Sequence, residues 1–591
     1  MTTNLLWCIL ISVYVRKNVT MTDYPSSLCK IDKFRDLFHL RLTFPLLCVT
    51  LQQYKASKQR RERGLFRMAI KLIMLLVFFG VMVGIGLYCR KNATDVNGFV
   101  LGGRSVGPWL TAFAYGTSYF SAVVFVGYAG QFGWKYGIAA TWAGIGNAIL
   151  GSLLAWVVLG RRTRIMTQHL DSATMPEFFG KRFGSPSLKI AASVIIFIFL
   201  IPYTASLYNG LSRLFGMAFD IDYSVCVVVM AVLTGIYVIA GGYMATAIND
   251  FIQGIIMLFG ICAVILAVLN SQGGFMAALT KLAQVPNEAA AGPVAGAPGV
   301  FASFFGPDPV NLLGVVILTS LGTWGLPQMV QKFYAIKSEK SINTGTVIST
   351  LFAMVVSGGC YFLGGFGRLF AGVVGVTENG TPVGGFDAVI PAMLSGLPDI
   401  LLAVVVILVL SASMSTLSSL VLTSSSTLTL DLLKGHIIKK MDEKQQVFIM
   451  RCLIVVFIAI SVVLAVIQYK SSVTFIAQLM GVSWGALAGA FLAPFLYGLY
   501  WRGTTKTACW TSFLFSTLVM LADISPLKAH FPALLVSPIN CGAFCMVAGL
   551  ILVPVVSLFT ARPEKSLVDH AFSCYEEKVT VPKSCALGDP Q

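Results

Sequence analysis

Apolar residues recur along this chain in long windows that are separated by short polar stretches. From residue 68 onward, windows of roughly 20 mostly apolar residues repeat, which is the length that an α-helix needs to cross a bilayer. We place these windows at residues 68–88, 109–131, 138–159, 187–207, 223–240, 250–271, 311–331, 346–367, 400–430, 447–468, 474–499, 505–523 and 537–559. The pattern predicts an all-α polytopic membrane protein with about thirteen transmembrane helices.

The composition agrees with this fold class. Apolar residues make up 56% of the chain and charged residues only 11%, whereas a soluble domain has about 25% charged residues. The formal net charge of +17 would fit a nucleic-acid partner, but the basic residues lie in the loops between the windows. Membrane orientation explains that placement, so we expect the lipid bilayer and no nucleic acid as a partner.

Lys and Arg are distributed unequally between alternate loops. One alternate set of loops carries 18 of them and the opposite set carries 6. Positively charged loops remain on the cytoplasmic side of a membrane. We therefore expect the richer set, and with it the C-terminal tail at residues 561–591, to be cytoplasmic.

Residues 1–67 do not follow the pattern of the rest of the chain. Their apolar pieces are short and interrupted, and the basic cluster at residues 58–63 would lie on the non-cytoplasmic side of the first window. We expect residues 1–67 to be a doubtful N-terminal extension and the functional protein to start at or near Met68. The transmembrane domain is then expected at residues 68–560.

Hydroxyl side chains are concentrated in the ninth window, at residues 411–419, which read SASMSTLSS. On a helix, Ala412, Ser415, Thr416 and Ser419 would share one face. Neutral oxygens at membrane depth can replace the hydration shell of a small cation such as Na⁺ without the cost of burying several carboxylates. The alternative is close helix packing, for which Ser and Thr are also common in membranes.

Two windows contain residues that weaken a helix near its middle. Window 109–131 contains AYGTSYFSA at residues 114–122, and window 311–331 contains SLGTWGLP at residues 320–327. A pair of interrupted spans in matching positions of two halves indicates a transporter site at mid-membrane depth, where freed carbonyls bind ions. The alternative is that Gly and Pro are simply common in membrane helices.

Asp250 lies at the start of window 250–271 and has two possible roles. It could cap the helix N-terminus, where the helix dipole favours an acid. It could instead supply negative charge to a second cation near the hydroxyl-rich stretch.

Three segments together resemble the sodium/solute symporter family, most nearly its sodium/proline symporter branch. They are GFVLGGRSVGP at residues 98–108, GGYMATAINDFIQG at 241–254, and ASMSTLSS at 412–419 leading to DLLK at 431–434. The resemblance covers roughly residues 70–560 and implies a transporter core of five plus five helices in an inverted repeat. It implies a secondary active transporter, not an enzyme, that couples inward sodium movement to the uptake of a small organic solute.

The resemblance also implies which residues bind the ions. The first sodium would be held by the carbonyls of Thr117, Phe120 and Ala412 and the hydroxyls of Ser415 and Thr416. A possible second sodium would be held by Asp250, Ser415, Ser418 and Ser419.

The expected solute pocket departs from the proline branch. Its residues would be Tyr119, Ser121, Tyr203, Thr323 and Trp324. Tyr119 stands where that branch has an Asp, and Thr323 stands where it has an aromatic residue. We expect an amino acid such as proline, with a small carboxylate such as pantothenate or a monocarboxylate as the alternative, and a bacterial plasma membrane as the location.

Two other classes of protein fit the sequence poorly. A channel would need polar faces on several helices, whereas one helix here is strongly hydroxylated. A membrane-embedded transferase would need grouped His, Asp or Glu residues at the membrane surface, and the sequence shows no such grouping. The GxxxxGK[ST] motif of ATP-driven pumps is also absent from the sequence.

Overall fold

The computed structural model of the chain describes residues 73–219, 222–287, 290–434, 437–438, 440–471 and 476–576, and these are largely helical. The helices are α3 Val96–Leu101, α4 Pro108–Tyr119, α5 Ala129–Tyr136, α6 Thr141–Gly146, α7 Arg161–His169, α8 Met175–Arg182, α9 Pro186–Phe219, α10 Tyr223–Ser271, α11 Phe275–Ala283, α12 Pro309–Gly325, α13 Pro327–Ala335, α14 Glu339–Gly364, α15 Ala371–Val374, α16 Val389–Leu394, α17 Asp399–Thr427, α18 Glu443–Ser471, α19 Ile476–Tyr500, α20 Lys506–Asp523, α21 Pro538–Phe559 and α22 Lys565–Ser573. Short π-helical segments include η4 Val123–Tyr128 and η6 Asn147–Leu154. The predicted extension at residues 1–67 and the predicted start at Met68 lie outside the described residues.

Many of these helices are long and apolar enough to cross a membrane. Among the described residues there are eight such helices, or nine if α12 and α13 form one broken span, and a shorter apolar helix covers Ile73–Cys89. The all-α membrane fold is confirmed, whereas the count of thirteen spans stays a prediction. The two numbers differ partly because the helical stretches Val123–His169 and Tyr223–Ser271 each count as one candidate span but include residues of two predicted windows.

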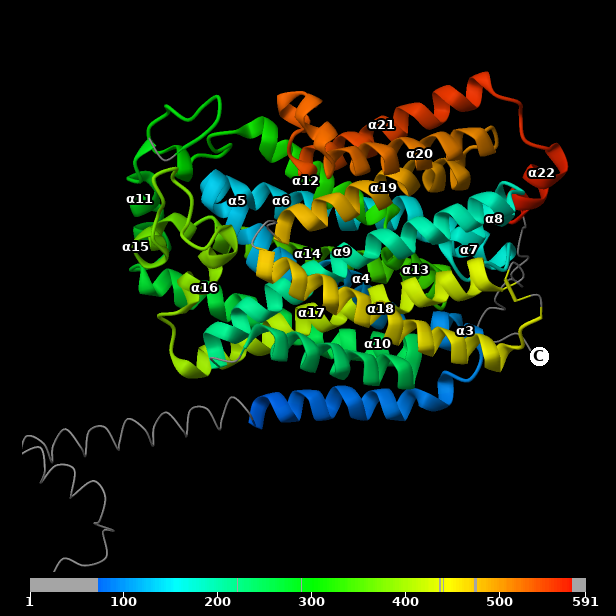
Figure 1. Cartoon of the computed structure of the whole chain (residues 1–591), viewed down its shortest axis with the longest axis horizontal. Helices are drawn as coiled ribbons and strands as arrows, with labels where there is room; N and C mark the ends of the chain where they lie inside the picture. Colours follow the sequence, from blue (N-terminus) through cyan, green and yellow to red (C-terminus); the bar gives the residue numbers. More distant parts are fainter. Residues whose placement is uncertain are drawn as a thin grey trace, which may run out of the picture. The chain divides into compact units, whose positions relative to one another are not determined.

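Helix α17, which carries the hydroxyl-rich stretch, lies inside the bundle (Figure 1). It contacts α4, α9, α10 and α18, and residues 408–427 are all buried. Because this part of α17 has no surface left for lipid, all of its hydroxyl groups face other parts of the protein.

Helix α10 consists of two helices that meet at Gly242. The backbone there has φ 55° and ψ −149°, a conformation that favours glycine, and a Cβ atom would lie 2.8 Å from the carbonyl oxygen of Phe99. The second helix starts directly after Gly242, so Asp250 lies about two turns inside it. The helix-cap alternative for Asp250 is therefore wrong, because a cap acts on the unpaired N–H groups of the first turn.

Both predicted helix interruptions are present. Helix α4 ends at Tyr119, and Phe120 has an extended backbone with φ −86° and ψ 116°. Helices α12 and α13 meet at 46° across Leu326, which is also extended. Pro327 accounts for the second break because it has no N–H group to continue the helix. At each break, backbone carbonyls lose their helical partners.

The apolar helix Ile73–Cys89 packs along α10. A Cβ atom at Gly86 would lie 2.9 Å from the Cα atom of Tyr237, so the two backbones approach closely at this glycine. Asn249 Nδ2 donates a hydrogen bond of 3.3 Å to the carbonyl of Met82. These contacts join the first described helix to α10.

The long segment at residues 272–310 contains α11 and packs on the bundle. Trp142 Nε1 donates a hydrogen bond of 2.9 Å to the carbonyl of Phe304, and the two rings meet edge to face. The loop is therefore fixed against the end of α6.

The described part of the C-terminal tail forms a helix that docks on the bundle. Helix α22 packs against α7 and α8. The buried ring of Phe572 lies 4.8 Å from the guanidinium carbon of Arg182, and Arg502 pairs with Asp569 at 2.8 Å and Glu576 at 2.5 Å. Burial lowers the pKa of Arg182 to about 10, which leaves it charged at neutral pH. The helix was missed because it is too short and too polar for a search based on apolar windows.

Replacing Phe572 with alanine is expected to release α22 from the bundle. Truncating a buried Phe to Ala costs roughly 3–5 kcal/mol in a protein core, which the exposed ion pairs of Arg502 cannot replace. Limited proteolysis should then cleave the tail faster than in the parent protein. Lys565→Ala, at an exposed position of the same helix, is the control, and equal protection of the Phe572 variant would contradict this docking.

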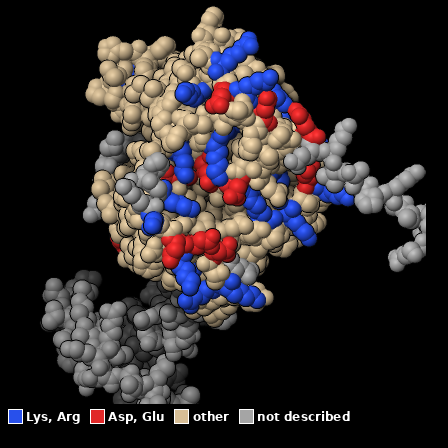
Figure 2. Space-filling view, turned by 90° about the vertical axis from the view of Figure 1, so that its right-hand side faces the viewer, with Lys and Arg blue, Asp and Glu red and all other residues tan. Residues whose placement is uncertain are grey.

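Charged side chains gather at the end of the bundle that carries α22 (Figure 2). Lys and Arg side chains are interleaved there with Asp and Glu. Three of the basic residues from the predicted cytoplasmic loops lie at this end. Arg182 and Arg502 contact Phe572 and Asp569 of α22, and Arg161 is the first residue of α7. The cytoplasmic orientation of this end stays a prediction.

Candidate functional site

Most hydroxyl groups of α17 bond to carbonyls of their own helix. Ser418 Oγ donates to the carbonyl of Ser415 at 2.9 Å, and Ser425 Oγ donates to the carbonyl of Leu422 at 3.1 Å. Such local bonds satisfy Ser and Thr inside a helix without any outside partner. Ser415 and Thr416 differ, because their hydroxyls also reach a second helix.

The hydroxyls of Ser415 and Thr416 meet backbone carbonyls at the broken end of α4. Ser415 Oγ lies 3.1 Å from the carbonyl oxygens of both Thr117 and Ala412. Thr416 Oγ1 lies 3.1 Å from the same two oxygens and 3.3 Å from the carbonyl oxygen of Phe120. We call these three carbonyls and two hydroxyls the five-oxygen cluster. The structure therefore brings together all five oxygens predicted for the first sodium.

The five-oxygen cluster suits a small hard cation of single charge. A hard cation such as Ca²⁺ binds oxygen at about 2.3–2.6 Å, which puts neighbouring ligands about 3.4 Å apart. The hydroxyl and carbonyl oxygens that contact one another in the cluster are already 3.1–3.3 Å apart, so a few tenths of an ångström would make room for an ion. Its five oxygens belong to carbonyls and hydroxyls, which are neutral, so the charge of the ion would not be cancelled by a carboxylate of the cluster.

Two of the four residues predicted for a second sodium lie beside a different cation. Lys332 Nζ donates a hydrogen bond of 3.0 Å to Ser419 Oγ and lies 3.9 Å from Asp250 Oδ2. Ser418 bonds to the carbonyl of Ser415 in its own helix. A lysine ammonium group thus lies beside two of the four predicted ligands.

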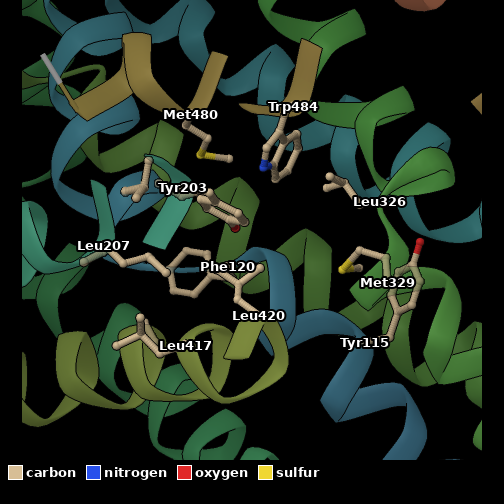
Figure 3. Packing of buried hydrophobic residues seen from close by; sticks show 14 of the residues in the cluster. Tyr115, Phe120, Tyr203, Leu207, Leu326, Met329, Leu417, Leu420, Met480 and Trp484 are labelled. Atoms are coloured by element: carbon tan, nitrogen blue, oxygen red, sulfur yellow. The ribbon is translucent and has the colours of Figure 1, made fainter. Parts of the chain in front are cut away.

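Two of the predicted solute residues, Ser121 and Tyr203, lie close together, and Tyr203 also contacts Trp484 of α19. The hydroxyl of Tyr203 approaches the side chains of Ser121 and Trp484, and the Tyr203 and Trp484 rings meet edge to face with centroids 5.9 Å apart. Figure 3 shows the Tyr203 ring between Trp484 and Phe120, which forms the break of α4. An aromatic wall beside a helix break can cover the apolar part of a small ligand.

The other predicted solute residues have different surroundings. Thr323 Oγ1 donates to the carbonyl of Gly151 at 2.8 Å, and Trp324 Nε1 donates to the carbonyl of Leu150 at 2.8 Å. Their polar atoms are therefore engaged by η6 rather than by Ser121 or Tyr203. Tyr119 is the last residue of α4, and its side chain lies outside what the structure describes.

Comparison with known families agrees with this geometry. The sequence profile described as "Sodium:solute symporter family" matches residues 99–514, which is more than half of the chain. The chain belongs to the sodium:solute symporter family. The symporter is thus a transporter and not an enzyme, in agreement with the sequence analysis.

Curated relatives cover nearly the same length as the symporter. The osmoregulated proline transporter OpuE of Bacillus subtilis (strain 168) is 28% identical over 507 residues, which cover 84% of this chain and 97% of that protein. The sodium/proline symporter of Staphylococcus aureus (strain JH9) is 29% identical over 514 residues, which cover 83% and 92%. These similarities agree with the predicted resemblance to the sodium/proline branch.

A solved structure shares the fold. The substrate-bound, outward-open state of a Na⁺-coupled sialic acid symporter superposes with a TM-score of 0.66 at 16% identity, covering 84% of this chain and 99% of that chain. At this identity the likeness concerns the fold alone. It confirms the transporter fold with a core of five plus five helices.

Arg104, in the family-like segment at residues 98–108, links three parts of the symporter. Its guanidinium donates to the carbonyls of Ser172 at 2.7 Å, Tyr334 at 3.3 Å and Thr167 at 3.4 Å. Burial lowers the pKa of Arg104. These bonds fasten the loop before α4 to the ends of α7 and α13.

Sequence reasoning missed three buried residues near the helix breaks. Gln328 lies in the first turn of α13, is fully buried, and neither atom of its amide has a hydrogen-bond partner among the described residues. Lys332 lies inside α13, one residue beyond the predicted window 311–331, and Trp484 lies within the mostly apolar window 474–499. The signal for the first two was their spacing of four residues, which puts Gln328 and Lys332 on one helical face.

Proposed function

We propose that this symporter couples sodium bound at the five-oxygen cluster to the uptake of a small amino acid of the proline type. The observation that carries the proposal is the convergence of two hydroxyls of α17 on the carbonyls freed at the break of α4. The printed names of two relatives, a proline transporter and a sodium/proline symporter, supply the solute class.

A bound sodium ion would fix α4 against α17. Thr117 and Phe120 lie on α4 and at its break, whereas Ala412, Ser415 and Thr416 lie on α17. Without the ion, the two hydroxyls donate to the carbonyls, and with the ion all five oxygens would turn to it. Because Ser121 directly follows the break, ion binding and solute binding would stabilise one another reciprocally.

The solute would bind between the two helix breaks. The N-terminus of α13 is the positive end of a helix dipole, which favours a carboxylate. Ser121, Tyr203 and Trp484 would cover the apolar part of the solute. Tyr119, Thr323 and Trp324 would complete the pocket, the last two by holding α12 against η6. A small carboxylate such as pantothenate or a monocarboxylate is the second candidate, because it presents the same charged group.

The same proposal includes the location and orientation of the protein. A bacterial plasma membrane agrees with the apolar helices and with the bacterial relatives. The excess of basic residues in one set of loops supports a cytoplasmic C-terminus.

Uptake by the purified protein in liposomes tests the proposal. With sodium outside and potassium inside, the protein should accumulate one member of a radiolabelled panel of proline, other small amino acids, pantothenate and monocarboxylates. Protein-free liposomes and liposomes without a sodium gradient are the controls. Accumulation that persists without the sodium gradient would contradict sodium coupling, and accumulation of a carboxylate alone would replace the amino acid by the second candidate.

A further inference from the structure

A buried ion pair lies inside the bundle, next to the hydroxyl-rich helix. Lys332 of α13 and Asp250 of α10 are each only 1% exposed, and their charged atoms Nζ and Oδ2 are 3.9 Å apart. The ammonium group also lies 5.1 Å from the centre of the Tyr243 ring, whose face attracts a cation. A charge buried inside a membrane protein needs such partners. The Asp250 carboxylate and the Tyr243 ring therefore stabilise the buried ammonium group.

The ammonium group is connected to the five-oxygen cluster through two serines. Lys332 Nζ donates to Ser419 Oγ at 3.0 Å, and Ser419 Oγ lies 2.9 Å from Ser118 Oγ. Ser118 follows Thr117 of the cluster, and Ser419 lies four residues after Ser415, a rise of about 6 Å along α17. The lysine therefore reaches the neighbouring turn of the same two helices that form the cluster.

The charges around Asp250 favour one cation there and oppose a second. Lys332 and Asp250 together carry no net charge, so an added sodium ion would put two positive charges beside one carboxylate. A sodium ion in the five-oxygen cluster meets only neutral oxygens. Asp250 Oδ2 accepts no hydrogen bond from any described residue, so the carboxylate would be free to bind another cation if the ammonium group were removed.

We propose that the Lys332 ammonium group is a permanent cation in the position of a second transported sodium, so that each cycle carries a single sodium ion at the five-oxygen cluster. This inference rests on the proposed sodium coupling. It assigns Lys332 as the residue that determines the ion stoichiometry. It also assigns Asp250 and Ser419 to a hidden cation site, which opens when the lysine is replaced.

Equilibrium binding of radiolabelled sodium to the purified full-length protein tests this assignment. The parent protein should bind one ion per chain with a Hill coefficient of one. Lys332→Met, which keeps the length of the side chain and removes its charge, should bind two ions with a Hill coefficient above one. The double variant Lys332→Met/Asp250→Asn, which is again neutral at this position, should return to one ion.

The outcomes separate this inference from the proposed function. Two ions bound to the parent protein, or one ion bound to folded Lys332→Met, would overturn the role of Lys332 and leave sodium coupling intact. No sodium bound to the parent protein would overturn sodium coupling itself and this inference with it. If Lys332→Met fails to fold, sodium binding to the parent protein and to the double variant still tests the assignment. Two ions bound to either of these proteins would overturn it.

Discussion

Replacing Thr416 with alanine is expected to raise the sodium concentration for half-maximal uptake about ten-fold or more, and Ser415→Ala should do the same. Each variant removes one oxygen that would bind the ion. A lost hydrogen-bond-like contact to a charged group is worth roughly 1.5–3 kcal/mol, and every 1.4 kcal/mol is about a ten-fold change in affinity. The measurement is the initial uptake rate against sodium concentration at a fixed membrane potential.

Helix α17 itself provides the control for these two variants. Ser425 is also buried, but its hydroxyl donates only to Leu422 of the same helix. Ser425→Ala should therefore leave the sodium dependence unchanged. If Ser415→Ala and Thr416→Ala, in folded protein, have the sodium dependence of the parent, the cluster only packs two helices together and the ion binds elsewhere.

Replacing Gln328 with leucine is expected to lower uptake and to raise stability in the same protein. The buried amide has no hydrogen-bond partner among the described residues, and an unsatisfied buried polar group costs roughly 1–3 kcal/mol. An apolar side chain of similar size removes that cost, so the thermal unfolding temperature should rise. If the amide binds a charged group of the solute, its loss should raise the Michaelis constant for the solute about ten-fold or more.

Gln331, on the same helix, provides the matched control. Its Nε2 donates to the carbonyl of Val100 at 3.0 Å, and its Oε1 accepts from Thr423 at 2.8 Å. Gln331→Leu leaves both partners unpaired, so its stability should fall rather than rise. A Gln328 variant that takes up solute like the parent protein would place the solute away from the start of α13.

Helical periodicity and helix-breaking residues predicted where the five-oxygen cluster lies, and the family resemblance implied its individual oxygens. Ser415 and Thr416 are neighbours in sequence, and their face of α17 follows directly from 3.6 residues per turn. The breaks in α4 and between α12 and α13 follow from local Gly, Ser and Pro residues. All five oxygens of the cluster lie within a few residues of these signals, which is why a reading of local sequence, together with the family resemblance, found them.

The pairing of Lys332 with Asp250 could not be predicted in that way. The two residues are far apart in the sequence, and Lys332 stands one residue beyond an apolar window, where a lysine normally reaches solvent. Burial of its ammonium group depends on how α13 packs against α10 and α17, which is a tertiary property. The same holds for Trp484, whose position beside Tyr203 depends on the packing of α19 against α9, and for α22, whose few apolar residues become buried only after docking.

The neutral pair of Lys332 and Asp250 has an electrical consequence. Moving one elementary charge through 100 mV releases about 2.3 kcal/mol, which corresponds to roughly 50-fold accumulation. If a lysine that never leaves the protein replaces a second ion, a zwitterionic solute would be transported with the inward movement of one charge. The return of the empty carrier would move no net charge at this pair. Membrane voltage would then act mainly on the steps in which sodium is bound at the five-oxygen cluster. The solute accumulation that the voltage can drive would not exceed the value for one ion.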